Sequence, residues 1–183
     1  MRPSAATVLA AALLLAACGR PDVTSYRVPK GSSGEAPAGA AHEHGGRAAA
    51  LRWSVPKGWR EKAPSSMRLA SFDVPEKGEL CDASIVVLEG GAMGVLANVN
   101  RWRGQIGLPP LEGEKSLAET SVKVKTGAGE AVVVDLAGSD TRLLAAVLSR
   151  NGETWFVKLT GPAKGAASAK PAFLELVRSL RPS

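Results

Sequence analysis

Hydrophobic positions beyond residue 50 recur mostly with the two-residue alternation of β-strands. The segment 51–55 alternates apolar with polar residues, which predicts a half-buried strand, and residues 56–58 (Pro-Lys-Gly) then provide a turn. Trp59 follows this turn and is expected to fold back onto the same core. Two more strands are predicted over 67–74 and 83–88, and the second is apolar on both faces, as in a central strand covered above and below.

The most definite local structure lies between residues 143 and 159, where Asn151 and Gly152 separate two apolar runs. Asn-Gly in this position is typical of the type I′ turn of a β-hairpin. A two-residue loop fixes the strand register. We therefore expect four facing pairs, namely Arg150 with Glu153, Leu148 with Trp155, Ala146 with Val157 and Leu144 with Leu159. Strands over 121–125 and 131–136 complete an antiparallel meander.

Two segments instead follow the helical period. Between residues 95 and 107 one apolar stripe is formed by Val95, Val99, Trp102 and Ile106, and two prolines follow at 109 and 110. Near the C-terminus Pro171 suits an early helical position, and a second stripe is formed by Phe173, Leu176, Val177 and Leu180. The pattern predicts an α+β fold, with an antiparallel β-sheet of about six to seven strands covered by an internal helix and a C-terminal helix.

The first seventeen residues resemble the signal peptide of bacterial lipoproteins. Arg2 gives a positive start, and the apolar run 5–17 is shorter than the roughly 20 residues of a spanning helix. The run ends in Leu-Ala-Ala-Cys-Gly at 15–19, which matches the lipobox at every position. This resemblance implies cleavage after Ala17, lipidation and acylation of Cys18, and firm attachment to a membrane. Gly after the cysteine, in place of Asp, favours the outer membrane facing the periplasm if the source is Gram-negative.

Residues 18–50 are predicted to form the lipidated cysteine and a flexible tether, because this segment is rich in Gly, Ala, Pro and Ser. It contains His42 and His44, the only two histidines of the chain. Neutral imidazole binds Cu(II) and Zn(II), but a durable zinc site needs three or four ligands held by folded structure. The pair is therefore either part of a solvated linker or a weak copper or zinc site. Residues 51–183 remain as one globular domain.

Composition restricts the function further. The net charge of +6 in 183 residues comes from cations scattered among acids, so nucleic-acid binding is not expected. The domain beyond residue 50 has no histidine, which removes the usual Ser-His-Asp and Cys-His catalytic arrangements, and we expect neither an enzyme nor a cofactor. With Cys18 lipidated, Cys81 has no disulfide partner in the chain. Cys81 is either a buried small hydrophobe or a reactive redox thiol.

The helix predicted over 95–107 also carries a polar face, which is the candidate partner-binding surface. Its residues are Asn98, Arg101 and Gln105, with Asn100 and Arg103 on neighbouring lines. Such planar donors and acceptors suit carboxylate, phosphate or peptide groups. The alternative is that these side chains hold loops of the same domain. The glycine-rich segment 90–94 before the helix is either an anion-binding loop or a tight turn.

The order of a Trp-rich strand at 53–59, paired strands, an internal helix, a meander and a final helix resembles the PsbP/Mog1-type α/β/α sandwich. The segments 98–105 and 154–161 resemble small uncharacterised bacterial lipoproteins. The resemblance covers residues 51–180 and implies a non-catalytic module that docks to larger proteins. The chain is therefore expected to be a membrane-anchored, non-enzymatic envelope lipoprotein with a protein partner, and the alternative is a weak metal-handling lipoprotein using His42 and His44.

Overall fold

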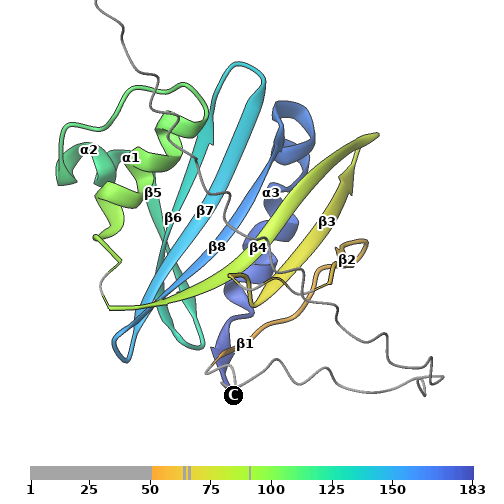
Figure 1. Cartoon of the computed structure of the whole chain (residues 1–183), viewed down its shortest axis with the longest axis horizontal. Helices are drawn as coiled ribbons and strands as arrows, with labels where there is room; N and C mark the ends of the chain where they lie inside the picture. The colour runs from red at the N-terminus through yellow and green to blue at the C-terminus, as the bar shows by residue number, and fades with distance from the viewer. Residues whose placement is uncertain (1–50, 64, 66, 91) are drawn as a thin grey trace, which may run out of the picture. The chain divides into compact units, whose positions relative to one another are not determined.

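The computed structural model describes residues 51–63, 65, 67–90 and 92–183, and within them one antiparallel sheet carries helices on both faces (Figure 1). The strands of the sheet are β2 (Arg60–Glu61), β3 (Ala70–Glu76), β4 (Glu79–Glu89), β5 (Ser121–Thr126), β6 (Gly129–Ala137), β7 (Thr141–Arg150) and β8 (Glu153–Pro162). The helices are α1 (Val95–Gln105), α2 (Glu114–Thr120) and α3 (Ala163–Arg178). The seven strands lie in the order β2-β3-β4-β8-β7-β6-β5. Two short strands, β1 (Leu51–Arg52) and β9 (Arg181–Pro182), pair separately.

The β7–β8 hairpin has the register that the sequence predicts. The pairs Arg150–Glu153, Leu148–Trp155, Ala146–Val157 and Leu144–Leu159 are all present. Asn151 and Gly152 both have positive φ, at 51° and 78°, as a type I′ turn requires. The antiparallel meander of β5 to β8 is likewise confirmed.

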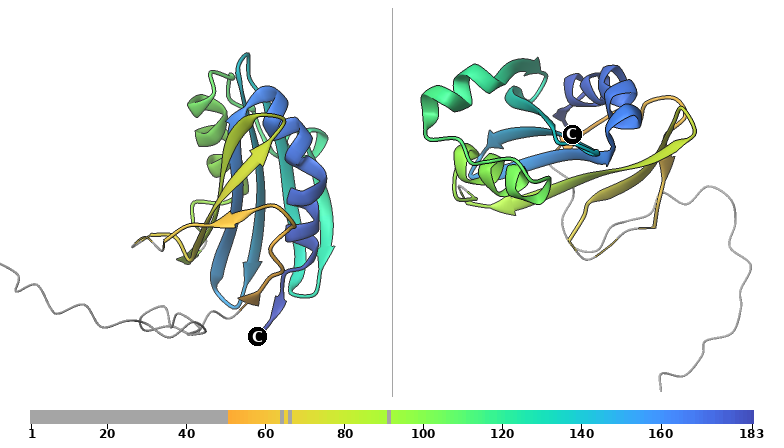
Figure 2. Two further views of the ribbon diagram at one scale, coloured as in Figure 1. Left: turned by 90° about the vertical axis from the view of Figure 1, so that its right-hand side faces the viewer. Right: turned by 90° about the horizontal axis from the view of Figure 1, so that it is seen from above.

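Two apolar layers cover the two faces of the sheet. On one face α3 packs through Phe173, Leu176 and Val177, which are all fully buried. On the other face α1 packs through Val99 and Trp102. Figure 2 shows the blue α3 and the yellow-green α1 on opposite sides of the sheet in its right-hand view. The α+β class and the antiparallel sheet are confirmed, with helices on both faces.

Several boundaries differ from the expectation, and β4 begins at Glu79, four residues before the strand expected over 83–88. Helix α3 begins at Ala163, so Pro171 lies inside it and not near its start. Four of the eight helical residues before Pro171 are alanine, which favours a helix, and the hydrogen bond that proline removes is offset by the packing of α3 on the sheet. The strand expected over 51–55 is only Leu51–Arg52, and the one expected over 67–74 begins at Ala70.

Several other features qualify the prediction. Val55 and Met67 are 42% and 78% exposed, so the apolar alternation there does not correspond to burial. Helix α2 was not predicted, and its only buried residue is Leu117. The strand expected over 83–88 was predicted to be buried on both faces, but this burial ends before Leu88, which is 41% exposed. No helix in the described ranges combines the length and the apolar character that crossing a membrane requires.

The signal peptide at 1–17, Cys18 with its lipobox, and the tether with His42 and His44 lie outside the described residues.

Candidate functional site

Helix α1 is fixed on the sheet by its apolar stripe. The ring of Trp102 meets Phe156 of β8 edge-on, with a centroid distance of 5.9 Å and an interplanar angle of 86°. Val99 is fully buried beside them, while Val95 and Ile106 are partly buried against the same cluster. This is the stripe that the helical spacing predicts, and it holds the opposite side of α1 away from the sheet.

Asn98 is part of the fold and not of an exposed face, since it is only 2% exposed. Its side-chain amide donates hydrogen bonds to the backbone carbonyls of Ala92 and Gly94. Its Oδ1 accepts a hydrogen bond of 2.8 Å from Nη2 of the exposed Arg101. Asn98 thereby closes the turn into α1 and orients the guanidinium of Arg101.

Asn100 and Arg103 hold the segment that follows α1. The side-chain amide of Asn100 exchanges two hydrogen bonds with the backbone of Leu111, at 2.7 and 3.1 Å. Arg103 Nε donates to the carbonyl of Pro109 at 2.6 Å. Of the five residues predicted to bind a partner, Arg101 and Gln105 are the two that are exposed.

The glycine-rich segment before α1 forms a turn with unusual backbone angles. Ala92, Met93 and Gly94 all have positive φ, at 41°, 63° and 80°. Three successive residues in this region reverse the chain sharply between β4 and α1. The described part of the segment thus forms a tight turn into α1, with Asn98 binding its carbonyl oxygens.

A second polar region lies on the same side of the sheet as α1, and we call it the polar sheet face. It consists of Ser71 and Asp73 of β3, Asp82 and Ser84 of β4, and Lys158 and Thr160 of β8. Strand register arranges these residues in two rows: Ser71, Ser84 and Lys158 face one another, and so do Asp73, Asp82 and Thr160. Residues that face one another across antiparallel strands have Cβ atoms about 5 Å apart.

Two cations neutralise the carboxylates of this face. Asp73 and Asp82 face each other directly, which is unfavourable for like charges unless a cation lies between them. Lys62 Nζ lies 2.5 Å from an oxygen of Asp82 and 3.2 Å from one of Asp73. Arg68 Nη1 contacts both oxygens of Asp82, at 3.0 and 3.3 Å. The hydrogen bond to Asp82 is the main reason that the pKa of Lys62 is raised, although burial opposes it.

Lys158 differs from Lys62 because its ammonium group has no hydrogen-bond or ion-pair partner among the described residues. Burial is the main cause that lowers the pKa of Lys158, and the positive charge of Arg68 lowers it further. Asp82 acts in the opposite direction, and Arg101 of α1 adds to the lowering. Lys158 was not among the site residues predicted from the sequence. Its place two residues from Phe156 in the same strand puts both side chains on the face that α1 covers.

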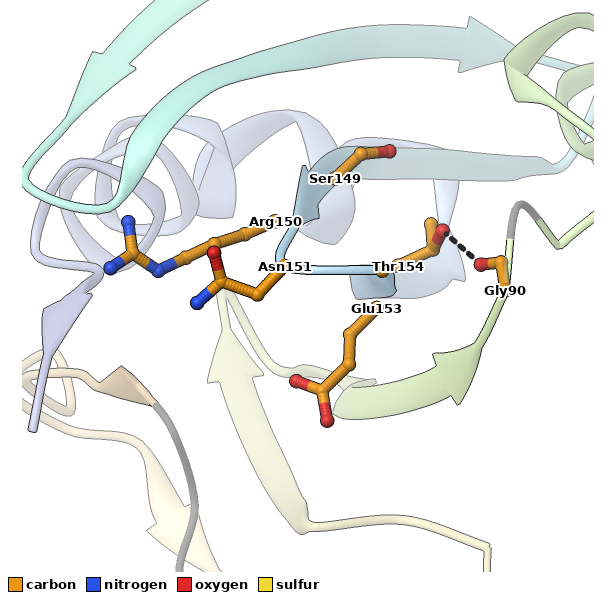
Figure 3. A pocket seen from close by; sticks show the side chains of 7 residues that line it. Gly90, Ser149, Arg150, Asn151, Glu153 and Thr154 are labelled. Atoms are coloured by element: carbon orange, nitrogen blue, oxygen red, sulfur yellow. Dashed lines mark hydrogen bonds between the residues drawn. The ribbon is translucent and has the colours of Figure 1, made fainter.

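A shallow pocket of about 310 Å³ lies at the tip of the β7–β8 hairpin (Figure 3). Thr154 Oγ1 donates to the carbonyl of Gly90 at 3.0 Å and links the end of β4 to the hairpin. Arg150 points away from this link, and its Nη1 donates to the carbonyl of Ala128. These contacts are explained by the folding of the hairpin, and the pocket is not our candidate site.

Cys81 is confirmed as a buried small side chain, with 1% exposure. Burial raises the pKa of its thiol, and the negative charges of Glu79 and Glu76 raise it further. A redox thiol needs an accessible thiolate. The alternative of a reactive redox cysteine is therefore wrong.

In the described ranges no group of three or more His, Cys, Asp or Glu side chains is placed to hold a metal ion.

Similarity to known proteins is limited to solved structures, since no protein-family model and no curated protein matches the chain. The chain is similar to a Bacteroides thetaiotaomicron protein with 14% sequence identity and a TM-score of 0.43, over 73% of this chain and 45% of that one. It is also similar to LpqN, involved in cell envelope biogenesis of Mycobacterium tuberculosis, with 14% identity and a TM-score of 0.42. The LpqN match covers 72% of this chain and 82% of LpqN. The chain thus spans less than half of the Bacteroides protein.

Proposed function

We propose that this chain is a lipid-anchored, non-enzymatic protein of the bacterial cell envelope that binds a protein partner through the exposed side of α1. The anchor would be Cys18, which the lipobox places directly after the signal peptide. In a Gram-negative source the favoured location is the outer membrane, facing the periplasm. The resemblance of the predicted order of elements to PsbP/Mog1-type sandwiches supports a docking role by analogy only.

The hydrogen bond between Asn98 and Arg101 is the observation that carries the partner-binding role. Asn98 is buried and its amide is also bonded to two backbone carbonyls, so the oxygen that binds Arg101 is held in place. A guanidinium that is already oriented loses less conformational entropy when it binds a partner. Arginine is also among the residues enriched at the energetically dominant positions of protein interfaces.

Site-specific photo-crosslinking in living cells tests this role. A photo-reactive amino acid at Gln105, one helical turn from Arg101, is expected to capture one protein of defined mass, and Arg101→Ala is expected to weaken that capture at least tenfold. The same amino acid at the exposed Glu130, on β6, is the matched control. Equal capture from both positions, or capture unaffected by Arg101→Ala, would contradict binding through α1.

The anchor has its own test. Mass spectrometry of the protein from its native membranes is expected to show an acylated N-terminus at Cys18, and Cys18→Ser is expected to release the protein into the soluble fraction. An unmodified N-terminus at another residue would overturn the anchor without affecting the role of α1.

Weak copper or zinc handling by the His42-Glu43-His44 segment is the second candidate function. Two alternate imidazoles provide a partial ligand set for either metal. Calorimetry of the full chain with Cu(II) is expected to show binding that disappears when both histidines become alanine. Binding that survives this double substitution would exclude the segment as the site.

A further inference from the structure

We propose that Lys158, Arg68 and Arg101 form a binding site for a phosphate-type oxyanion on the polar sheet face. The site lies beside the exposed side of α1, and it does not depend on the proposed protein partner. Its three cations come from three separate parts of the chain, namely β8, the segment before β3, and α1.

The charge balance of this region leaves positive charge without a counter-ion. Asp73 and Asp82 are the acids of the polar sheet face, and Lys62 with Arg68 already neutralises them. Lys158 is an additional positive charge in the adjacent row, where it faces Ser84 of β4 and not a carboxylate. Half-buried charges are normally paired, so an unpaired lysine in this position indicates a group that the chain itself does not supply.

The surroundings of Lys158 favour an anion over a neutral ligand. The positive charges of Arg68 and Arg101 oppose protonation of Lys158, and the carboxylate of Asp82, which Lys62 and Arg68 already bind, acts in the other direction. An anion bound at Lys158 would replace the repulsion of Lys158 by these two arginines with attraction to all three cations. Attraction of this kind is stronger where the groups are partly removed from water.

Hydroxyl groups complete the site. Ser84 faces Lys158 directly, and Ser71 follows it in the same row, with exposures of 3% and 4%. Thr160 lies two residues along β8 on the same face as Lys158. Together with three cations, hydroxyl donors suit a tetrahedral phosphate, which carries more charge and more acceptor atoms than one carboxylate.

Titration of the full chain in a neutral detergent with inorganic phosphate tests the site, with chloride keeping the ionic strength constant. We expect saturable binding with a dissociation constant of about 1 mM or tighter. Lys158→Met is expected to weaken binding at least tenfold. Lys123→Met, at an exposed position of β5, is the matched control and is expected to leave binding unchanged. Absence of saturation, or equal binding by Lys158→Met and wild type, would overturn the proposal.

Thermal unfolding separates loss of the site from loss of the fold. Phosphate is expected to raise the Tm of the wild type and of Lys123→Met, but not that of Lys158→Met. Without phosphate, Lys158→Met is expected to be at least as stable as the wild type, because it removes a half-buried unpaired charge. If Lys158→Met does not fold, the pKa of isotope-labelled Lys158 in the wild type is measured instead. Its pKa is expected to rise on phosphate addition, and an unchanged pKa would overturn the proposal.

Two sources can supply this chemistry, a phospholipid head group or a soluble phosphate compound. Vesicles of phosphatidylglycerol and of phosphatidylcholine distinguish them when the wild type is compared with Lys158→Met. A Lys158-dependent preference for phosphatidylglycerol identifies the head group. Saturable phosphate binding without that preference identifies a soluble ligand. No effect of Lys158→Met in either arm would overturn the site altogether.

Discussion

The carboxylate of Glu79, at the start of β4, accepts a hydrogen bond of 2.5 Å from the backbone N–H of Gly165, which lies 86 residues later in the first turn of α3. The residue that precedes this helix is Pro162, whose side chain has no acceptor atom and makes no capping hydrogen bond. Glu79 therefore does what a capping side chain does at most helix starts, and its negative charge suits the positive end of the helix dipole.

Replacing Glu79 is expected to loosen the start of α3. Glu79→Ala should lower the free energy of unfolding by about 1 kcal/mol, because a first-turn N–H loses its acceptor and the helix loses a favourable charge. Urea unfolding followed by circular dichroism gives the measurement. Glu130→Ala is the matched control, since Glu130 forms an exposed ion pair with Lys123 and such pairs contribute little. Equal losses for the two variants would show that the cap has no special role.

Asp135 is expected to make the fold sensitive to acid. Burial alone raises the pKa of its carboxyl group, but hydrogen bonds from Arg142 and Lys170 outweigh burial and lower the pKa below 3.8. A carboxyl whose pKa is lowered by folding stabilises the protein above its unfolded pKa, and this stabilisation is lost as the pH falls through the folded value.

Asp135→Asn is therefore expected to cost about 2 kcal/mol at pH 7, since two cations lose a charged acceptor. The difference from the wild type should shrink as the pH falls below about 3.8. Urea unfolding across this range measures it. A difference that stays constant with pH would mean that ionisation of Asp135 does not contribute.

Cys81 is expected to be inert in the folded protein. Its sulfur is buried against Gly161, where an added methyl group would overlap it. In a Cys18→Ser background, alkylation of Cys81 should be at least ~100-fold slower than in urea, because the thiol reacts only after opening of the structure. Gln105→Cys in the same background is the exposed comparison and should react at once. Rapid labelling of Cys81 without denaturant would contradict its burial.

The charge of Lys158 is expected to make the free energy of unfolding depend on pH in the alkaline range. Because folding lowers its pKa below 10.5, the unfolded chain binds more protons than the folded chain between the folded pKa and 10.5. The stability of the wild type relative to Lys158→Met should therefore rise with pH in that window. Urea unfolding of both proteins from pH 7 to pH 10.5, without phosphate, provides the comparison. A stability difference between the two proteins that stays constant with pH, or that shifts in favour of Lys158→Met as the pH rises, would contradict this effect of the Lys158 charge.

The candidate site was only partly predictable. The helical period placed Arg101 and Gln105 on the exposed side of α1, where the structure has them. It placed Asn98 on the same face, yet Asn98 is buried, because the turn before α1 folds back over it and presents carbonyl oxygens. A helical period specifies only which residues share a side of the helix. It does not specify which loop covers that side.

Features that depend on near neighbours along the chain follow directly from the sequence. Asn151 and Gly152 adopt a turn that most other residues would disfavour, so the register of β7 and β8 follows from two residues and their alternating neighbours. The meander and the stripe of α1 are set in the same way, because period and side-chain chemistry act over a few residues.

Features that join distant parts of the chain depend on the tertiary fold. Helix α3 begins at Ala163, and Glu79 of β4 caps its first turn, although the local sequence predicted a start near Pro171. The polar sheet face exists because β4 lies between β3 and β8, which brings Asp73, Asp82 and Lys158 onto adjacent rows. Burial and charge at such positions depend on which strands become neighbours, and no local pattern carries that information.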